Sequence, residues 1–151
     1  MKLKIEPLKI NLHLDHILEI ENQVQITPWS KQQFLDGLNA GNQGTVLLFG
    51  ETLIGYGLLQ LTDKEAEILT IAIHHDYQCQ GYGRKLLNAL CEQVKHAGAH
   101  TLFLEVRKSN IAAQKLYHQA GFVEINRRKN YYKTLNGHED AIILRGLFNV
   151  Y

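Results

Sequence analysis

A glycine-containing turn, Gln78-Cys79-Gln80-Gly81-Tyr82-Gly83-Arg84, separates an apolar run that ends at Ile73 from a segment with helical periodicity. Backbone N–H groups at the start of a helix have no internal partners, and together with the helix dipole they attract an anion. Glycines allow a phosphate to approach the main chain, so the turn predicts a pyrophosphate site. The alternative is that Gly81 and Gly83 only form a tight turn. The spacing fits neither a Walker loop nor a dinucleotide fingerprint.

Two titratable side chains follow this turn in the sequence. Glu105 interrupts the apolar run 102–106, and strands covered by helices on both faces normally carry no charge in their interior. It stands near the carboxyl end of that run, where open α/β sheets bind ligands, and partial burial there raises a carboxyl pKa toward that of a general base. The alternative is a carboxylate exposed at a strand end. Tyr117 shares a helix face with Ala113 and Ala120, so periodicity alone predicts that its ring fills the core.

Alternating strands and helices must position these residues. Ser30 and Gln33 form a capping box, Asn110 is a helix N-cap, and Gly98 and Gly121 end helices. After a short opening strand, the apolar patterns predict strands near 45–49, 53–61, 66–73, 101–106, 122–128 and 141–147, and helices near 14–24, after 30, at 83–97 and at 111–120. A polar loop containing Asn136-Gly137 precedes the last strand. We therefore expect an α/β fold with a mixed sheet of about seven strands, a parallel crossover in its middle and four helices.

Composition narrows the class of protein. The chain has 151 residues, 45% of them hydrophobic, and 16 Lys+Arg against 15 Asp+Glu, so it lacks the basic excess that non-specific nucleic-acid binding requires. No apolar run approaches the roughly 20 residues of a membrane helix, and charges interrupt the first six residues. Cys79 and Cys91 are too far apart on one helix for a disulfide. With no repeat or linker, these features predict a single domain, 1–151, in the cytoplasm.

Several other features carry less information. Two histidine pairs have no third ligand at a suitable spacing, so we expect no metal site: His13 with His16, and His96 with His100. The thiol of Cys79, near a helix start, is either reactive through a lowered pKa or an inert small side chain. The basic residues 127–129 with Tyr131 and Tyr132 are compatible with a solvated loop or a nucleic-acid patch.

Together the Gln78-x-x-Gly81-x-Gly83 turn, Glu105, Asn110 and Tyr117 resemble the acetyl-CoA site of the GNAT superfamily of N-acetyltransferases, and the resemblance covers most of the chain. Some stretches resemble more narrowly the bacterial branch that acetylates the N-terminal alanine of a small-subunit ribosomal protein. These stretches are Pro28-Trp29-Ser30, Leu104-Glu105-Val106-Arg107 with Ser109-Asn110, Arg127-Arg128 with Asn130-Tyr131-Tyr132, and Glu139-Asp140-Ala141-Ile142-Ile143.

The resemblance implies a GNAT-like acyl-CoA N-acyltransferase fold with acetyl-CoA as co-substrate. It implies that Glu105 is the general base, that Tyr117 is the general acid, and that Asn110 contacts the co-substrate. By the same resemblance, the backbone contacts to the pantetheine arm come from Ile71, Ala72 and Ile73. The backbone contacts to the pyrophosphate come from Cys79, Gln80, Gly81, Tyr82, Gly83 and Arg84. The residues implied to line the peptide groove are Trp29, Tyr131 and Tyr132. The chain departs from the family at His74-His75, where a proline usually follows the first residue, and at Cys79, which replaces a common basic residue.

The expected acceptor is an N-terminal amine. Deprotonation at pH 7 costs an α-amine of pKa near 8 about 1 kcal/mol, against about 4–5 kcal/mol for lysine. We therefore expect a monomer or weak oligomer that acetylates the N-terminal peptide of a ribosomal protein, with no direct nucleic-acid or membrane partner. The alternatives are a GNAT enzyme acting on other protein N-termini, lysine or a small amine, and a non-catalytic module that binds acyl-CoA or RNA.

Overall fold

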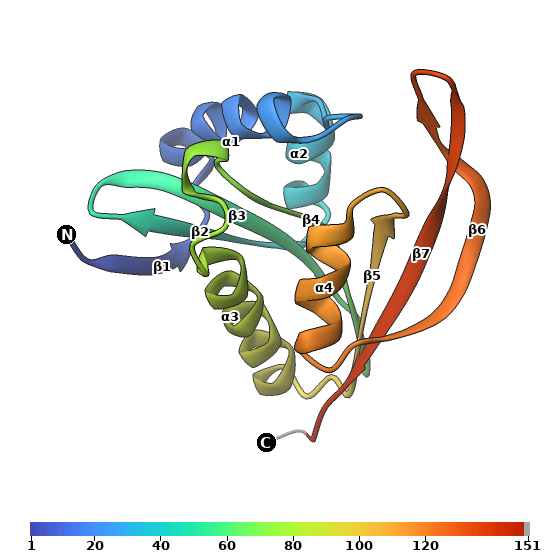
Figure 1. The fold of residues 1–151 in the computed structure, drawn as a ribbon. Coiled ribbons are helices and arrows are strands. Elements are labelled where there is room, and N and C mark those ends of the chain that lie inside the picture. Colours follow the sequence, from blue (N-terminus) through green and yellow to red (C-terminus); the bar gives the residue numbers. More distant parts are fainter. Residues whose placement is uncertain (150–151) are drawn as a thin grey trace.

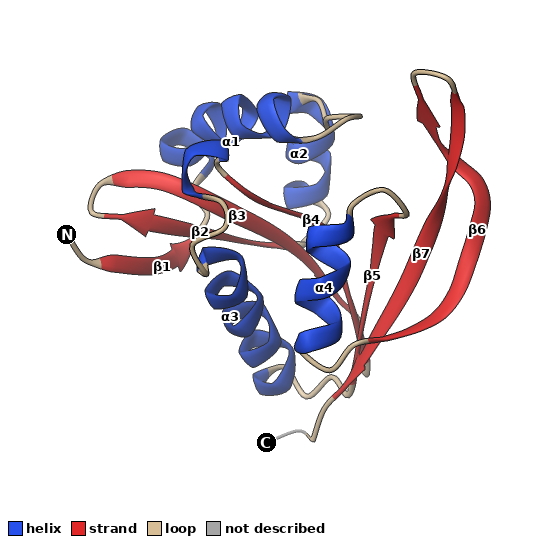
Figure 2. Ribbon diagram, in the orientation of Figure 1, coloured by secondary structure: helices blue, strands red, loops and turns tan. Residues whose placement is uncertain are grey.

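The computed structural model describes residues 1–149, which form one seven-stranded sheet with helices on both faces (Figures 1 and 2). The strand order is β1-β2-β3-β4-β5-β7-β6. The strands are β1 (Leu3–Pro7), β2 (Gln43–Phe49), β3 (Thr52–Leu61), β4 (Glu65–Ile73), β5 (Thr101–Arg107), β6 (Val123–Thr134) and β7 (Gly137–Leu147). The helices are α1 (Ile10–Val24), α2 (Lys31–Asn39), α3 (Tyr82–His96) and α4 (Ile111–Gln119), with a short 3-10 helix, η1 (His75–Tyr77). In the described part of the chain the expected mixed α/β sheet with four α-helices is confirmed.

The pairing of β4 with β5 is the functionally important feature of the sheet. It is parallel, whereas the other neighbouring pairs are antiparallel. The pairing covers only residues 65–67 of β4 and 101–103 of β5. A register shift opposite β3 leaves Leu69 of β4 without a pairing partner, as in a β-bulge. Beyond this point β4 and β5 diverge, as Figure 1 shows.

The starts of α2 and α4 and the ends of α3 and α4 follow from predicted capping residues. The Ser30 side chain accepts a hydrogen bond from the Gln33 backbone N–H, and the Gln33 side chain bonds the Ser30 N–H in return, which confirms the capping box. The Asn110 side chain accepts from the Ala113 N–H at 3.2 Å and so begins α4. After α3 and α4 the chain turns at Gly98 and Gly121, whose φ angles are +83° and +94°; these left-handed conformations favour glycine.

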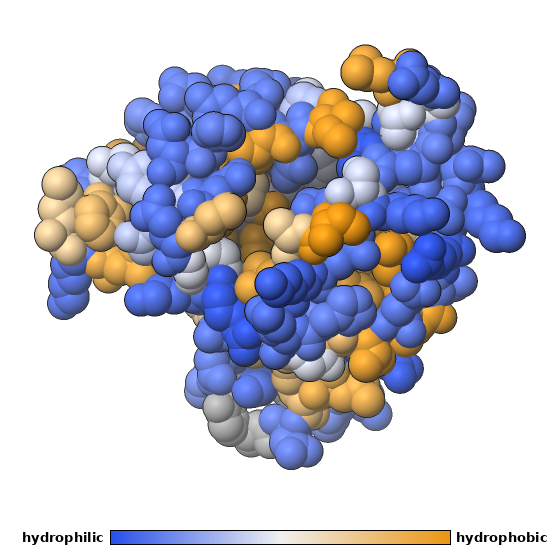
Figure 3. All heavy atoms as spheres, viewed as in Figure 1, coloured by the Kyte–Doolittle hydropathy of each residue, from blue (hydrophilic) through white to orange (hydrophobic). Residues whose placement is uncertain are grey.

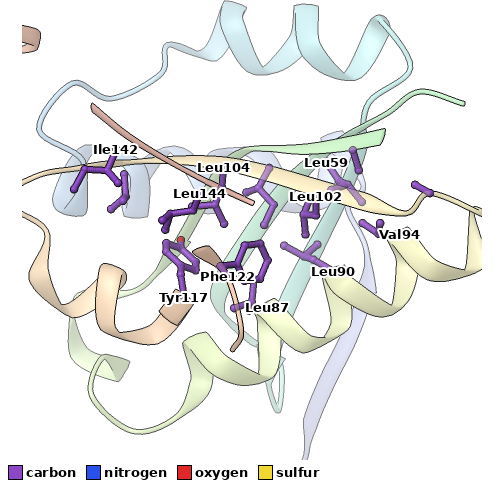
Figure 4. Close-up of a cluster of buried hydrophobic side chains, with 14 residues drawn as sticks. Leu59, Leu87, Leu90, Val94, Leu102, Leu104, Tyr117, Phe122, Ile142 and Leu144 are labelled. Carbon is purple, nitrogen blue, oxygen red and sulfur yellow. The ribbon is translucent and has the colours of Figure 1, made fainter. Parts of the chain in front are cut away.

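Two hydrophobic layers hold the helices to the sheet. On one face α1 and α2 bury Leu14, Ile17, Ile20 and Phe34. On the other face, residues of α3 and α4 pack against β5 and β7; Figure 4 shows this cluster, which includes Leu87, Leu90, Leu102, Leu104, Tyr117, Phe122 and Leu144. Closely packed side chains therefore lie on both faces of the sheet around the place where β4 and β5 separate.

The C-terminal hairpin differs from the sequence-based expectation. The predicted strand at 122–128 continues to Thr134 as β6, and β7 begins at Gly137 rather than near Ala141. Residues 127–134 are therefore on a strand and not in a solvated loop. The sequence concealed this because the stretch is exposed and charged, and because a register shift between Arg128 and Tyr132 breaks its alternation. Asn130 lies within this irregularity with φ +52°, and its N–H donates to Asp140.

Within residues 1–149, no helix is both long enough and apolar enough to cross a bilayer. The same residues contain no group of three or more His, Cys, Asp or Glu side chains arranged to hold a metal ion. Cys79 and Cys91 are both free.

Candidate active site

Two adjoining cavities fill the opening between β4 and β5. The turn cavity, of about 440 Å³, is lined by Val24, Gln25, Ile71, Ala72, Ile73, Gln78, Cys79, Gly81, Gly83, Arg84, Asn110, Ala112, Ala113, Leu116, Tyr117 and Gln119. It brings together eight of the residues that the sequence analysis assigned to the co-substrate: Ile71, Ala72, Ile73, Cys79, Gly81, Gly83, Arg84 and Asn110. Figure 3 shows a hollow with an apolar floor between α1 and the α3–α4 pair.

The start of α3 leaves its backbone N–H groups available to a ligand. Its N-cap, Gly81, has φ +87° and offers no side-chain cap, and the first turn contains no acidic side chain. Cys79 has φ +61°, which is unusual for a residue with a Cβ. Gly83 follows in the first turn of α3 and also lines the turn cavity. These features fit an anion such as a diphosphate at the helix start.

The edge of β4 that faces β5 has main-chain groups that no strand pairs. The carbonyl of Ile71 accepts a hydrogen bond from the Gln25 side-chain amide at 3.5 Å, and the carbonyl of Ile73 accepts one from Gln78 at 3.0 Å. Carbonyls two residues apart on a strand point toward the same edge. This edge therefore faces the turn cavity and can pair with an extended ligand, as it would with another strand.

The Glu105 cavity lies on the other side of Tyr117 and has a volume of about 190 Å³. It shares Gln25, Ile71, Asn110, Ala113 and Tyr117 with the turn cavity. The remaining lining residues are Glu21, Thr27, Trp29, Ile68, Leu69, Thr70, Leu104, Glu105, Val106, Arg107 and Tyr132. Because the linings overlap, a ligand in the turn cavity can meet a second molecule beside Glu105.

Glu105 is held at the wall of this cavity by two partners from β6. Its Oε1 pairs with Nε of Arg128 at 3.2 Å, and its Oε2 accepts from the Tyr132 hydroxyl at 3.4 Å. The side chain is 23% exposed, so the carboxylate is neither sealed in the core nor free in solvent. On β4, burial and the neighbouring charge of Glu105 raise the pKa of Glu67. Glu67 and Glu105 are therefore close enough to interact, although Glu67 lines neither of the two cavities.

Tyr117 belongs both to the core and to the two cavities. Its ring is 5% exposed and lies 6.0 Å from the Phe122 ring, as periodicity predicts (Figure 4). The same residue lines both cavities. Burial raises the pKa of Tyr117 to about 12, so the phenol keeps its proton throughout the neutral range.

The end of the Glu105 cavity remote from the turn is lined by a cluster around Arg107. The Arg107 guanidinium lies 4.2 Å from the Tyr132 ring centroid, pairs with Glu139 at 3.3 Å and donates to the Thr27 hydroxyl at 3.0 Å. It thereby ties β5 to the hairpin and to the segment between α1 and α2. Trp29 also lines this cavity.

Not every expected site residue lines a cavity. Tyr131 is 51% exposed and lies outside both linings, as do Gln80 and Tyr82. The Gln80 side chain donates to the Asp76 carbonyl, and the Tyr82 ring packs near Phe49. Glu21, Gln25 and Arg107 line the Glu105 cavity without having been predicted as site residues. Their place in the cavity depends on the folding together of α1, β4 and β5, which local sequence patterns do not reveal.

Comparisons with known proteins identify the family and the fold. The profile described as "Acetyltransferase (GNAT) family" matches residues 14–122. The [Ribosomal protein bS18]-alanine N-acetyltransferase of Escherichia coli strain K12 is 43% identical over 130 residues, which span 83% of this chain and 84% of that protein. The crystal structure of the ribosomal-protein-S18-alanine N-acetyltransferase from Escherichia coli has a TM-score of 0.93 at 35% identity, covering 99% of this chain and 96% of that one.

A more distant solved structure shares the fold alone. It is a GNAT family acetyltransferase from Elizabethkingia anophelis with acetyl-CoA bound, with a TM-score of 0.81 at 20% identity; the match covers 97% of this chain and 98% of that one. The chain belongs to the GNAT family of acetyltransferases. It is therefore an acyltransferase.

Proposed function

We propose that this enzyme transfers the acetyl group of acetyl-CoA to the N-terminal alanine of ribosomal protein bS18. The observation that carries the proposal is the meeting of the turn cavity and the Glu105 cavity at Tyr117. One cavity ends at an uncapped helix start that suits a diphosphate, and the other ends at a carboxylate. The E. coli relative that carries this activity in its name is 43% identical.

Acetyl-CoA supplies the acetyl group as an activated thioester. The N–H groups of the 79–84 turn would hold its diphosphate, because they begin α3 with no competing side-chain cap. The unpaired edge of β4 at 71–73 would bond its pantetheine arm, with Gln25 and Gln78 giving way or bridging at the two carbonyls. A backbone N–H near Ile73 would stabilise the charge that develops on the thioester oxygen. Asn110 completes this wall.

Two side chains would move the protons. Glu105, directly or through a water, accepts the proton that the acceptor amine loses as it attacks. Tyr117 donates its phenolic proton to the departing thiolate. With a pKa raised to about 12, Tyr117 is a weaker acid than free tyrosine. The same apolar surroundings raise the basicity of a thiolate formed beside it, so the transfer remains near balance.

The acceptor would enter past Trp29, Tyr132 and Arg107, which line the end of the Glu105 cavity remote from the turn. An N-terminal amine suits this site better than lysine because its deprotonation at neutral pH costs less by about 3 kcal/mol. Trp29 and Tyr132 would shape the space beside the first residue of the peptide. We assign Tyr131 to the outer wall, since half of it is exposed.

The test is a peptide panel assayed for CoA release and checked by mass spectrometry. Peptides with the bS18 N-terminal sequence should be acetylated once, at the first residue, and blocking their α-amine should abolish turnover. Cell lysate from a strain lacking the enzyme should gain acetylation at the same N-terminus. Equal activity on blocked peptides would instead indicate a lysine or small-amine acceptor. Binding of CoA without turnover of any amine would indicate a non-catalytic module.

A further inference from the structure

Glu21 is a buried carboxylate that the proposed mechanism does not use. It lies near the end of α1, is 1% exposed and lines the Glu105 cavity. Its Oε1 accepts hydrogen bonds from the hydroxyls of Tyr56 and Thr70, and its Oε2 accepts one from the Trp29 backbone N–H at 2.8 Å. Burial and the charge of Glu21 together raise the pKa of Tyr56 far above its usual value. The Tyr56 hydroxyl therefore keeps its proton at neutral pH.

These bonds fix the position of the carboxylate from two directions. Tyr56 and Thr70 reach it from the sheet, on β3 and β4, while Trp29 reaches it from the segment between α1 and α2. A charged group is costly to bury unless donors surround it, so a carboxylate in this place is strongly oriented once its three donors are satisfied. Glu21 therefore connects the Trp29 main chain to the sheet.

The segment 25–30 has a second attachment on the other side of the cavity. The Thr27 hydroxyl accepts a hydrogen bond from Arg107 of β5 at 3.0 Å. Thr27 and Trp29 both line the Glu105 cavity. The wall that faces the acceptor is thus held at two points, one through Glu21 and one through Arg107. Between them the Trp29 ring packs 5.2 Å from the Phe34 ring.

We propose that Glu21 is a positioning residue that fixes Trp29 as the acceptor-side wall of the site. The proposal rests on the proposed function, because it concerns the same acceptor. Glu21 acts through the length and hydrogen-bonding geometry of its side chain, and its negative charge is not required. A hydroxyl can accept as well as donate. Gln at this position can therefore accept from the Trp29 N–H and donate to the Tyr56 and Thr70 hydroxyls. Asp is too short to reach the Trp29 N–H on one side and the two hydroxyls on the other.

The test compares Glu21→Asp with Glu21→Gln. A buried donor left without its acceptor, as the Trp29 N–H would be beside the shorter Asp, costs enough to change an equilibrium by about tenfold. Glu21→Asp should therefore raise the KM for the acceptor peptide by about 10-fold. The KM for acetyl-CoA should not move, and kcat at saturating peptide should fall by less than about 3-fold. Glu21→Gln should raise the acceptor KM by less than about 3-fold. Glu19→Gln, on an exposed position of the same helix, is the matched control.

Trp29 gives a direct structural readout because it is the only tryptophan in the chain. Its emission should shift to the red in Glu21→Asp, since the released segment exposes the ring to water, and should stay at the wild-type position in Glu19→Gln. An unchanged acetyl-CoA KM shows that the Asp variant is folded. If that variant does not fold, Tyr56→Phe is the substitute. It keeps the ring, loosens one oxygen of Glu21 and should raise the acceptor KM in the same direction by a smaller factor.

Two results would overturn the positioning role. One is a wild-type acceptor KM in Glu21→Asp, or in Tyr56→Phe if the former is not folded. The other is a larger acceptor KM in Glu21→Gln than in Glu21→Asp, which would mean that the charge is what matters. Failure of the proposed function is distinguishable, because wild-type enzyme would then release no CoA with any N-terminal peptide.

Discussion

Glu105 and Tyr117 differ in how their surroundings prepare them for proton transfer. Glu105 lies near the end of β5 with Arg128 and Tyr132 as partners and nearly a quarter of its side chain exposed. It can therefore exchange protons with water. Tyr117 is buried and keeps its proton at neutral pH. One residue is thus suited to accept a proton that must leave the site, and the other to donate one inside it.

Replacing Glu105 by Gln should remove the proton acceptor without changing the shape of the site. We expect kcat to fall by about 10²- to 10⁴-fold, the usual contribution of a positioned acid or base. The KM for acetyl-CoA should change little, because Glu105 does not line the turn cavity. Steady-state kinetics at pH 7 checks this, with Glu65→Gln, an exposed glutamate on β4, as the control. Wild-type turnover would exclude Glu105 as the base.

Tyr117→Phe tests the proposed acid. The ring remains in the core, so the fold should survive, while kcat should fall by about 10²-fold or more because the thiolate leaves without a proton. Because burial raises the pKa of Tyr117 to about 12, its ionisation should cause no fall in wild-type kcat below about pH 11. A pH–rate profile of both proteins checks the two statements. Unchanged turnover in the variant would exclude Tyr117 as the general acid and leave it only a packing role in the core.

At the scale of elements, the site depends on how α3 begins. Gly81 and Gly98 flank α3 with φ of +87° and +83°, and a Cβ on either would meet nothing within 4 Å. They therefore form a matched pair. Changing either to Ala should lower the free energy of unfolding by about 1 kcal/mol, because an L side chain disfavours this conformation. Urea denaturation measures that loss.

Only the Gly81→Ala change should affect the co-substrate. Gly81 lines the turn cavity and Gly98 does not, so strain that moves the turn should raise the KM for acetyl-CoA by several-fold in Gly81→Ala and leave it unchanged in Gly98→Ala. Equal KM values in the two variants would argue that the 79–84 turn does not hold the diphosphate.

The sequence predicted elements whose signals are local. The capping residues Ser30 and Asn110 placed the starts of α2 and α4, and the glycine after α4 placed its end. The start of α1 at Ile10, four residues before the predicted 14–24 helix, has no side-chain cap and gave no such signal. The length of β6 could not be predicted, because its pairing with β7 depends on a partner strand and its exposed side chains carry no apolar alternation. Glu21 was missed for a similar reason: its three donors come from β3, β4 and the segment after α1, and their proximity exists only in the folded chain.

At the scale of the whole molecule, buried tyrosines couple stability to alkaline pH. Burial raises the pKa of Tyr117 to about 12, and the pKa values of Tyr56 and Tyr132 are raised as well. In the unfolded chain these phenols ionise near pH 10. Above that pH the unfolded state binds fewer protons than the folded state, so the free energy of unfolding falls as pH rises. The stabilisation is complete below pH 10 and is lost toward pH 12.

Tyr117→Phe isolates one part of this effect. Between pH 9 and pH 11 the free energy of unfolding of the wild type should fall by about 1 kcal/mol more than that of the variant, which lacks the Tyr117 hydroxyl. Urea denaturation at a series of pH values measures it. A constant difference would show that Tyr117 ionises in the folded protein as it does in the unfolded one.

The divergence of β4 from β5 gives the sheet an unpaired edge in its interior. Unpaired strand edges are templates for association with other chains, and proteins usually cover them. Here Gln25 and Gln78 bond the carbonyls of Ile71 and Ile73, and under the proposed function the diffusible co-substrate covers the rest of the edge. Ligand depletion would then leave part of this strand edge uncovered. Saturation with a ligand at 100 times its Kd stabilises a folded protein by about 2.7 kcal/mol. The acetyl-CoA supply of the cell would then govern how long the enzyme persists without aggregating, as well as how fast it works.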